Sequence, residues 1–224
     1  MAIHIWRVSA AVVNLTALTV TGQQPKPNPD PAPIVQPGAP GQASKLLTPA
    51  TAFTPAKAPS QADISFMQGM IMHHSQAVEM TDLLRTRSHN KDLRSLAERI
   101  SISQSDEIKY MKQWLEDRGK PLEMAGMGAM NMADMKGMSM PLMPGMLTPQ
   151  QMEALAKATG PAFDHLFLTG MIQHHNGALI MVDDLFNTAG AGQDNVLFDF
   201  ATDVDNTQRA QIRIMQAMLL KEKR

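Results

Sequence analysis

The chain has 224 residues, enough for one ordinary domain with appendages, and 44% of them are hydrophobic, so a sizeable core can be buried. A net charge of −1 and an aromatic content of 4% argue against a nucleic-acid partner, which needs basic surfaces or stacking platforms. The sequence has no cysteine and 20 methionines. Disulfides, zinc–thiolate sites and thiol nucleophiles are therefore excluded, and the methionine thioether is the only soft sulfur ligand left.

Residues 1–22 are interpreted as an export signal. Arg7 precedes an uncharged, moderately apolar run from Val8 to Val20, and small or polar residues follow it. The run is too short and too rich in Thr and Asn to span a membrane. No cysteine follows it, which excludes a bacterial lipoprotein anchor. We expect a periplasmic or secreted bacterial protein, with no stable membrane insertion after signal removal.

Residues 23–59 are predicted to form a Pro-rich, disordered linker. They hold ten prolines, five of them at alternating positions from Pro25 to Pro33. Such a composition favours extended polyproline conformations and does not build a core.

The first helical hairpin is expected over residues 60–118. Ser60 and Asp63 have capping-box spacing, and apolar residues then recur every three or four positions until the pattern breaks near residues 88–90. A second helix is expected from about Asp92 to Arg118, ended by Gly119.

Residues 119–147 form a methionine-rich insert. Its methionines follow one another at intervals of 3-3-2-3-3-2-3-3, nine within 23 residues: Met124, Met127, Met130, Met132, Met135, Met138, Met140, Met143 and Met146. Interspersed glycines and prolines would break a helix, so a buried helical stripe is a poor explanation. The spacing favours a string of thioether clips for soft cations. A flexible apolar linker and a methionine surface for apolar partners are the alternatives.

A short helix is predicted over residues 148–159, where Thr148 to Gln151 suggests a second capping box and Pro149 takes the first helical position. The second hairpin is predicted over residues 161–222. Its first helix extends from Ala162 to about Asn187, and its second from about Asp194 to Leu220.

The two hairpins repeat one another. The motif Gly69-Met70-Ile71-x-His73-His74 recurs 101 residues later as Gly170-Met171-Ile172-x-His174-His175, and the second helices align with a shift of 104. Two hairpins that each expose an apolar stripe are expected to pack together. The predicted fold is therefore all-α: a four-helix bundle over residues 60–222, made of two duplicated αα-hairpins joined by the Met-rich segment and a short helix.

Histidines and methionines are the candidate metal ligands of this bundle. At about 100° per residue, His73 and His74 flank the inward stripe of their helix, and antiparallel packing brings methionines of the second helix level with them. The candidates are Met67, Met70, His73, His74, Met80 and Met111 in the first hairpin, and Met171, His174, His175, Met181 and Met215 in the second. This grouping places two or three methionines with two histidines in each hairpin. The alternative is that these residues only fill the core.

Mixed thioether and imidazole ligands point to copper, because thioethers select Cu(I) while imidazole serves several metals. Cu(I) is the preferred ion, with Cu(II) and Ag(I) as alternatives. No Glu-x-x-His occurs in the chain, and Glu79 is expected on the solvent side of its helix, which argues against a di-metal carboxylate oxidase.

The repeated motif resembles the bacterial "domain of unknown function 305" family, whose studied members include periplasmic copper-binding proteins of the CopM type. The resemblance covers roughly residues 60–222. It implies a ferritin-like four-helix bundle and a role in copper resistance or trafficking. The ligands it implies are Met70, His73, His74, Met80, Met171, His174, His175 and Met181. Met67 is replaced by Leu168 in the second copy, so the two sites are expected to differ in affinity.

The sequence therefore predicts a non-enzymatic, extracytoplasmic protein for copper sequestration, tolerance or trafficking, whose partners are metal ions and a copper-donor or copper-acceptor protein. Two alternatives stay open. One is a ferritin-like, metal-dependent redox enzyme such as a cuprous oxidase. The other is a module whose methionines bind apolar peptides.

Overall fold

A computed structural model describes residues 34–38, 41–48, 58–124 and 142–222. These fall into two units, Met1–Pro55 and Ala56–Arg224. The predicted export signal lies outside the described residues, as does much of the linker. The same is true of six insert methionines: Met127, Met130, Met132, Met135, Met138 and Met140.

In the first unit, strand β1 (Ile34–Gln36) pairs antiparallel with β2 (Lys45–Leu47). Ile34 lies opposite Leu47, and nearly all side chains of the pair are exposed. The Pro-rich range predicted as a disordered linker therefore contains a strand pair that the sequence analysis did not predict. Such exposed strands leave almost no hydrophobic pattern to detect, because neither face is buried.

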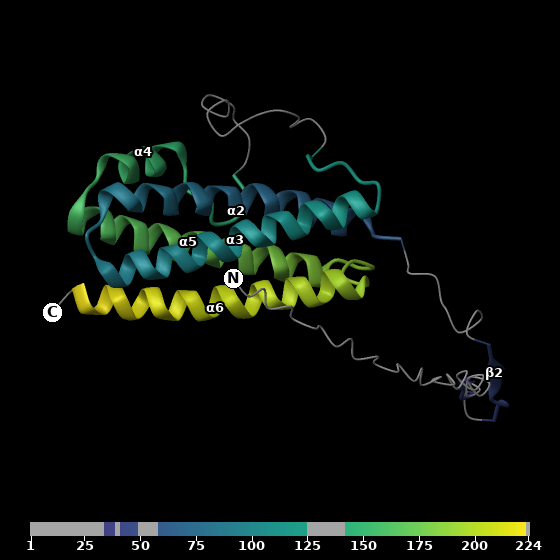
Figure 1. Ribbon diagram of the computed structural model, residues 1–224. Coiled ribbons are helices and arrows are strands. Elements are labelled where there is room, and N and C mark those ends of the chain that lie inside the picture. The colour runs from purple at the N-terminus through teal and green to yellow at the C-terminus, as the bar shows by residue number, and fades with distance from the viewer. Residues whose placement is uncertain (1–33, 39–40, 49–57, 125–141, 223–224) are drawn as a thin grey trace, which may run out of the picture. The chain divides into compact units, whose positions relative to one another are not determined.

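The described part of the second unit contains five helices (Figure 1). They are α2 (Gln61–Arg87), α3 (Lys91–Asp117), α4 (Pro149–Lys157), α5 (Gly160–Asn187) and α6 (Asn195–Glu222). These bounds confirm the predicted helices to within two residues. Within the described residues, no helix combines the length and apolarity needed to cross a membrane.

Local capping explains why the helices begin where predicted. The Ser60 hydroxyl accepts from the Asp63 amide, and the Asp63 carboxylate accepts from the Ser60 amide. Thr148 and Gln151 form the same box before α4. These side chains satisfy amide donors that have no partner within the helix. Asp63 also accepts from the Gly192 amide at 2.7 Å, which ties the start of α2 to the turn before α6.

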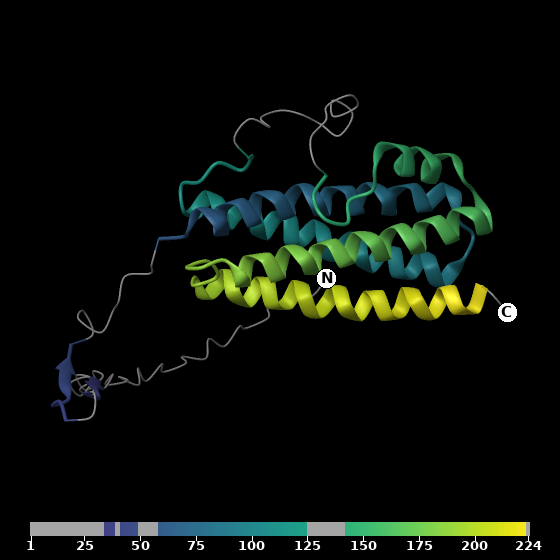
Figure 2. The ribbon, with the colours of Figure 1, turned by 180° about the vertical axis from the view of Figure 1, so that it is seen from behind.

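The four long helices lie side by side, α2 against α3, α5 against α6, and α2 against α5 (Figures 1 and 2). The short α4 contacts α5 and α2. Their buried apolar side chains form two clusters rather than one. The first core cluster is Ile64, Phe66, Met67, Met70, Ile71, Met111, Trp114, Leu115, Ala178, Val182, Leu185, Ala191, Leu197, Phe200, Ala201 and Val204. The second core cluster is Ala77, Met80, Leu84, Leu93, Leu96, Ala97, Ile100, Leu147, Leu155, Phe163, Phe167, Leu168, Met171, Leu179, Ile212 and Met215.

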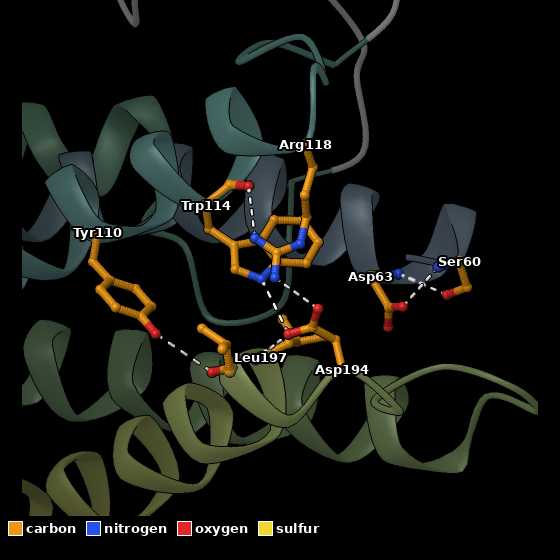
Figure 3. Close-up of polar contacts among 8 residues, drawn as sticks. Ser60, Asp63, Tyr110, Trp114, Arg118, Asp194 and Leu197 are labelled. Atoms are coloured by element: carbon orange, nitrogen blue, oxygen red, sulfur yellow. Dashed lines mark hydrogen bonds and ion pairs between the residues drawn. The ribbon is translucent and has the colours of Figure 1, made fainter. Parts of the chain in front are cut away.

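A polar junction joins the end of α3 to the start of α6 (Figure 3). Asp194 caps α6 by accepting from the Leu197 amide at 3.0 Å, and its other oxygen accepts from Arg118 at 2.7 Å. The Trp114 indole donates to the same carboxylate, and the Arg118 guanidinium stacks 4.3 Å from the Trp114 ring centroid. One carboxylate thus starts a helix and connects the two hairpins.

Candidate metal centre

A layer of four histidines separates the two core clusters along α2. The first core cluster ends on this helix at Ile71 and the second begins at Ala77. His73 and His74 lie between them, and α5 supplies His174 and His175. All four side chains are fully buried, with 0% exposure. Fully buried histidines are unusual, so a layer of four calls for a chemical explanation.

His73 and His174 meet where α2 and α5 pack together. Their ring centroids are 3.8 Å apart, with 37° between the ring planes. His174 Nε2 donates to the backbone carbonyl of His73 at 2.8 Å, and His73 Nε2 donates to the carbonyl of Pro144 at 3.0 Å. Each neighbouring pair on one helix is more widely spaced, with ring centroids 6.2 Å and 6.3 Å apart.

The other two histidines bond to the second helix of their own hairpin. His74 Nε2 donates to Glu107 Oε2 at 2.7 Å, and His175 Nε2 donates to Gln211 Oε1 at 2.6 Å. The sequence analysis missed both partners. The repeat contained the signal, because a shift of 104 places Glu107 and Gln211 at equivalent positions. A carboxylate in the first half thus corresponds to a neutral amide in the second.

Burial favours the neutral form of His73, His174 and His175. The pKa of His73 is lowered to about 3, chiefly by burial and then by the nearby His74, against the opposing effect of the Pro144 bond. Burial lowers the pKa of His175 to about 4, and burial with the adjacent His73 lowers that of His174. Burial alone would raise the pKa of Glu107, but its bond with His74 outweighs this, and the pKa is lowered.

The hydrogen bonds also set which ring nitrogen carries the proton. Carbonyl and carboxylate oxygens only accept, so each Nε2 is the protonated nitrogen. The four Nδ1 atoms are buried and have no hydrogen-bond partner among the described residues. In a neutral imidazole this Nδ1 carries a free lone pair. One N–H fixed by an oxygen and one free lone pair is the usual arrangement of a metal-ligating histidine.

Six candidate methionines are fully buried in the core clusters, namely Met67, Met70, Met80, Met111, Met171 and Met215. Met70 and Met111 share the first cluster, and Met171 and Met215 share the second. Met80 and Met181 lie in a different cluster from the other candidate methionines of their own helices. Met80 belongs to the second cluster, and Met181, which is half-buried, packs against the first. The reason is that α2 and α5 run in opposite directions, so each methionine reaches the other hairpin.

The end of the insert lies against the bundle. Met143 to Met146 form a turn in which the Met146 amide donates to the Met143 carbonyl at 3.2 Å and Gly145 has φ +74°. Met146 is 4% exposed and is therefore buried against the bundle. Met124, at the other end of the insert, is half-buried.

Two further buried polar residues went unpredicted as site components. Gln104 and Gln208 occupy equivalent positions of the repeat and are 1% and 2% exposed. Both amide atoms of Gln104 and the Gln208 Oε1 have no partner among the described residues. A buried amide without a partner costs about 1–3 kcal/mol, which is unusual in a core that serves stability alone.

Within the described ranges, no three His, Asp or Glu side chains are placed to hold one metal ion. Fully buried thioethers do lie on both sides of the histidine layer. The arrangement thus combines neutral imidazole nitrogens with methionine sulfur, a ligand set that suits a soft ion.

The fold and site define a class: a helical protein with a layer of buried histidines between methionine-containing core clusters. The chain belongs to the family described as Domain of unknown function (DUF305), whose model matches residues 63–219. A comparison with curated proteins gave no match.

Solved structures of this family are similar to the chain. One, from Streptomyces coelicolor, is described as a "putative secreted protein DUF305"; it is 28% identical, with a TM-score of 0.60, and the match covers 71% of this chain and 93% of that one. A DUF305 fragment from Deinococcus radiodurans is 26% identical, with a TM-score of 0.60 and coverage of 75% and 99%. CopM in its Cu(I)-bound form is 26% identical, with a TM-score of 0.53 and coverage of 71% and 96%. CopM has also been solved in Cu(II)-bound and Ag-bound forms.

Proposed function

We propose that the protein binds copper outside the cytoplasm, as Cu(I) in preference to Cu(II), and that it sequesters or transfers the ion without catalysis. The observation that carries the proposal is the set of four buried imidazoles with unpartnered Nδ1 atoms, placed between core clusters that contain fully buried methionines. The family relative CopM, which has been solved with copper and silver, supports it.

The chemistry of the donors favours Cu(I). Thioether sulfur is soft, and Cu(I) prefers two to four soft or imidazole ligands, whereas zinc sites usually contain cysteine or several imidazoles and carboxylates. Because the pKa values of His73 and His175 lie well below 7, an ion does not have to compete with protons for the Nδ1 atoms of these two residues. Copper tolerance or trafficking is the physiological role that such binding would serve.

The finer architecture belongs to the same proposal. We take the bundle as ferritin-like and built from two copies of one hairpin, because the sequence repeats and the partners of His74 and His175 correspond. Export from the cytoplasm is supported by the apolar run after Arg7 and by the description of the Streptomyces relative.

The test is a Cu(I) titration of the full chain against a chromophoric competitor. A variant with His73, His74, His174 and His175 changed to Ala is expected to lose the tightest equivalents while its circular dichroism stays helical. The matched control changes His89 and His165, which are exposed, to Ala and is expected to bind like the wild type. A second variant lacks residues 125–141 and keeps the docked turn, so that the contribution of the remaining insert methionines is measured separately.

Wild-type binding no tighter than that of free methionine would exclude the proposal. Oxygen consumption with repeated turnover after Cu(I) addition would instead favour the redox-enzyme alternative, to which Glu107 contributes one carboxylate. Peptide binding that is unaffected by copper chelators would favour the interaction module.

A further inference from the structure

The turn at the end of the insert is held by contacts on both sides. The Pro144 carbonyl accepts from His73, and the Gln76 side chain bonds both backbone groups of Leu147, at 2.7 Å and 3.0 Å. The Gly145 backbone packs directly on Gly177 of α5, where a Cβ on Gly177 would lie against the Pro144 carbonyl. The stretch leading into α4 is therefore fixed across α2 and α5 (Figure 2).

This turn places the thioether of Met143 over Gly69 of α2. A Cβ on Gly69 would lie 3.3 Å from Met143 Sδ and 3.4 Å from the Met181 methyl carbon. Both side chains thus reach one small patch that is open because residue 69 has no side chain. Met143 comes from the insert and Met181 from the second hairpin, while the patch belongs to the first.

The equivalent patch in the repeat differs in one respect. A Cβ on Gly170 would lie 3.0 Å from Leu147 Cδ2 and 3.3 Å from the Met80 methyl carbon. Met80 corresponds to Met181, but Leu147 takes the place of Met143. The insert therefore adds a second thioether at Gly69 and a hydrocarbon side chain at Gly170. Side chains fill the space above the glycine at both patches, but only at Gly69 do both of these side chains carry a thioether.

We propose that Met143 and Met181 form a thioether site for a soft monovalent cation, at which the insert and the bundle share one ion. The inference rests on the proposed function and places this site where the methionines of the insert meet those of the bundle. His73 follows Gly69 by one helical turn and bonds the residue next to Met143, so an imidazole is the next donor toward the core. Thioethers have no proton to release, which lets the pair bind independently of pH.

The experiment uses the full chain labelled with ¹³C at the methionine methyls and titrated with Ag(I), which avoids copper oxidation. Methyl signals are assigned by single Met→Leu substitutions. The Met143 and Met181 methyls are expected to shift in the same titration step. In Met143→Leu, the Met181 step should move to at least tenfold higher free Ag(I). The matched control, Met218→Leu, removes a half-buried methionine that is not a candidate ligand and packs against the second core cluster, so it should leave that step unchanged.

A gain-of-function variant guards against a folding artefact. Leu147→Met introduces a second thioether at Gly170. The methyl signal of Met80 is then expected to shift at a lower Ag(I) concentration than in the wild type. An unchanged Met181 step in Met143→Leu, with the Met70 and Met111 methyls still responding, overturns this inference and leaves copper binding by the bundle intact. If no methionine methyl responds, both the inference and the proposed function fail.

Discussion

Burying a neutral imidazole makes stability depend on pH. The pKa of His73 is about 3 and that of His175 about 4 in the folded protein, against 6.5 for an ordinary histidine. Below pH 6.5 the unfolded chain therefore binds protons that the folded chain does not. The free energy of unfolding consequently decreases as the pH is lowered. Each of the two histidines is expected to remove on the order of 2 kcal/mol between pH 8 and pH 5.

Urea unfolding of the metal-free protein at both pH values checks this expectation. The His89→Ala, His165→Ala double variant should keep the full pH dependence, because both residues are exposed. Equal stability at pH 8 and pH 5 would mean that the buried imidazoles accept protons in the folded state.

Glu107 and Gln211 differ by one charge at equivalent positions. The lowered pKa of Glu107 keeps it ionised at neutral pH, so it places a negative charge beside His74 that His175 lacks. Glu107→Gln is expected to preserve the hydrogen bond to His74, as Gln211 does to His175. It should weaken Cu(I) binding at the proposed site that contains His74 (the first-half site) by about 10- to 100-fold, the usual cost of losing a residue that supports a metal ligand. Competitive Cu(I) titration measures the change.

The reverse variant, Gln211→Glu, should strengthen Cu(I) binding at the proposed site that contains His175. It distinguishes an effect of charge from an effect of altered folding. Glu79→Gln on the exposed side of α2 is the matched control, with no expected change. Wild-type affinity in Glu107→Gln would show that the carboxylate serves only to orient His74.

The candidate site residues could be predicted where the sequence repeat and the helical periodicity indicate the same positions. The four histidines and six buried methionines were selected because their spacing places them on inward faces. The Pro144 partner of His73 was not predictable, because the two residues are 71 positions apart and meet only where the end of the insert packs on α2. Nothing in local spacing encodes a contact of that range.

At the scale of elements, helix ends were predicted well because capping is local. Ser60, Asn90 and Thr148 each accept amide bonds within three residues, so the sequence carries the whole signal. The β1–β2 pair was missed because its residues are mostly exposed and show no alternation. The packing of the end of the insert against the bundle was missed because its glycines and prolines were interpreted only as helix breakers. Gly145 also allows the backbone of the insert to approach the backbone of α5 closely.

Docking of the insert depends on Gly177. In Gly177→Ala, the new Cβ would collide with the Pro144 carbonyl and force the turn away from α5. The variant is expected to lose about 1–3 kcal/mol of stability, as other overpacked sites do, although alanine favours a helix over glycine. Thermal or urea unfolding measures the loss.

Asn176→Ala is the matched control for Gly177→Ala. Asn176 is the preceding, exposed residue of α5, and among the described residues its side chain bonds only to the Ile172 carbonyl of the same helix. This variant should change stability by less than about 0.5 kcal/mol. Equal effects of the two substitutions would contradict the role of the close contact.

At the scale of the whole molecule, the proposed ligands come from both hairpins, so an ion that they hold together would link the two hairpins. Met80 and Met181 each reach across to the opposite hairpin, and His73 stacks on His174. An ion held in this layer binds the folded chain and not the unfolded one, so free ion at 100 times its dissociation constant adds about 2.7 kcal/mol of stability. Ag(I) is therefore expected to raise the unfolding temperature.

The temperature shift should shrink in the variant with all four layer histidines changed to Ala and persist in the control with His89 and His165 changed. A shift of equal size in both variants would place the stabilising ion outside the histidine layer.

The division of the core into two clusters has a consequence for how the protein tolerates change. A single helix such as α3 contributes Leu96 and Ile100 to one cluster and Met111 and Leu115 to the other. Substitutions in different clusters share no packing neighbours, so their effects on stability should add, whereas those within one cluster should couple. Either end of the bundle is thus free to be repacked by evolution or by design while the opposite end keeps its shape.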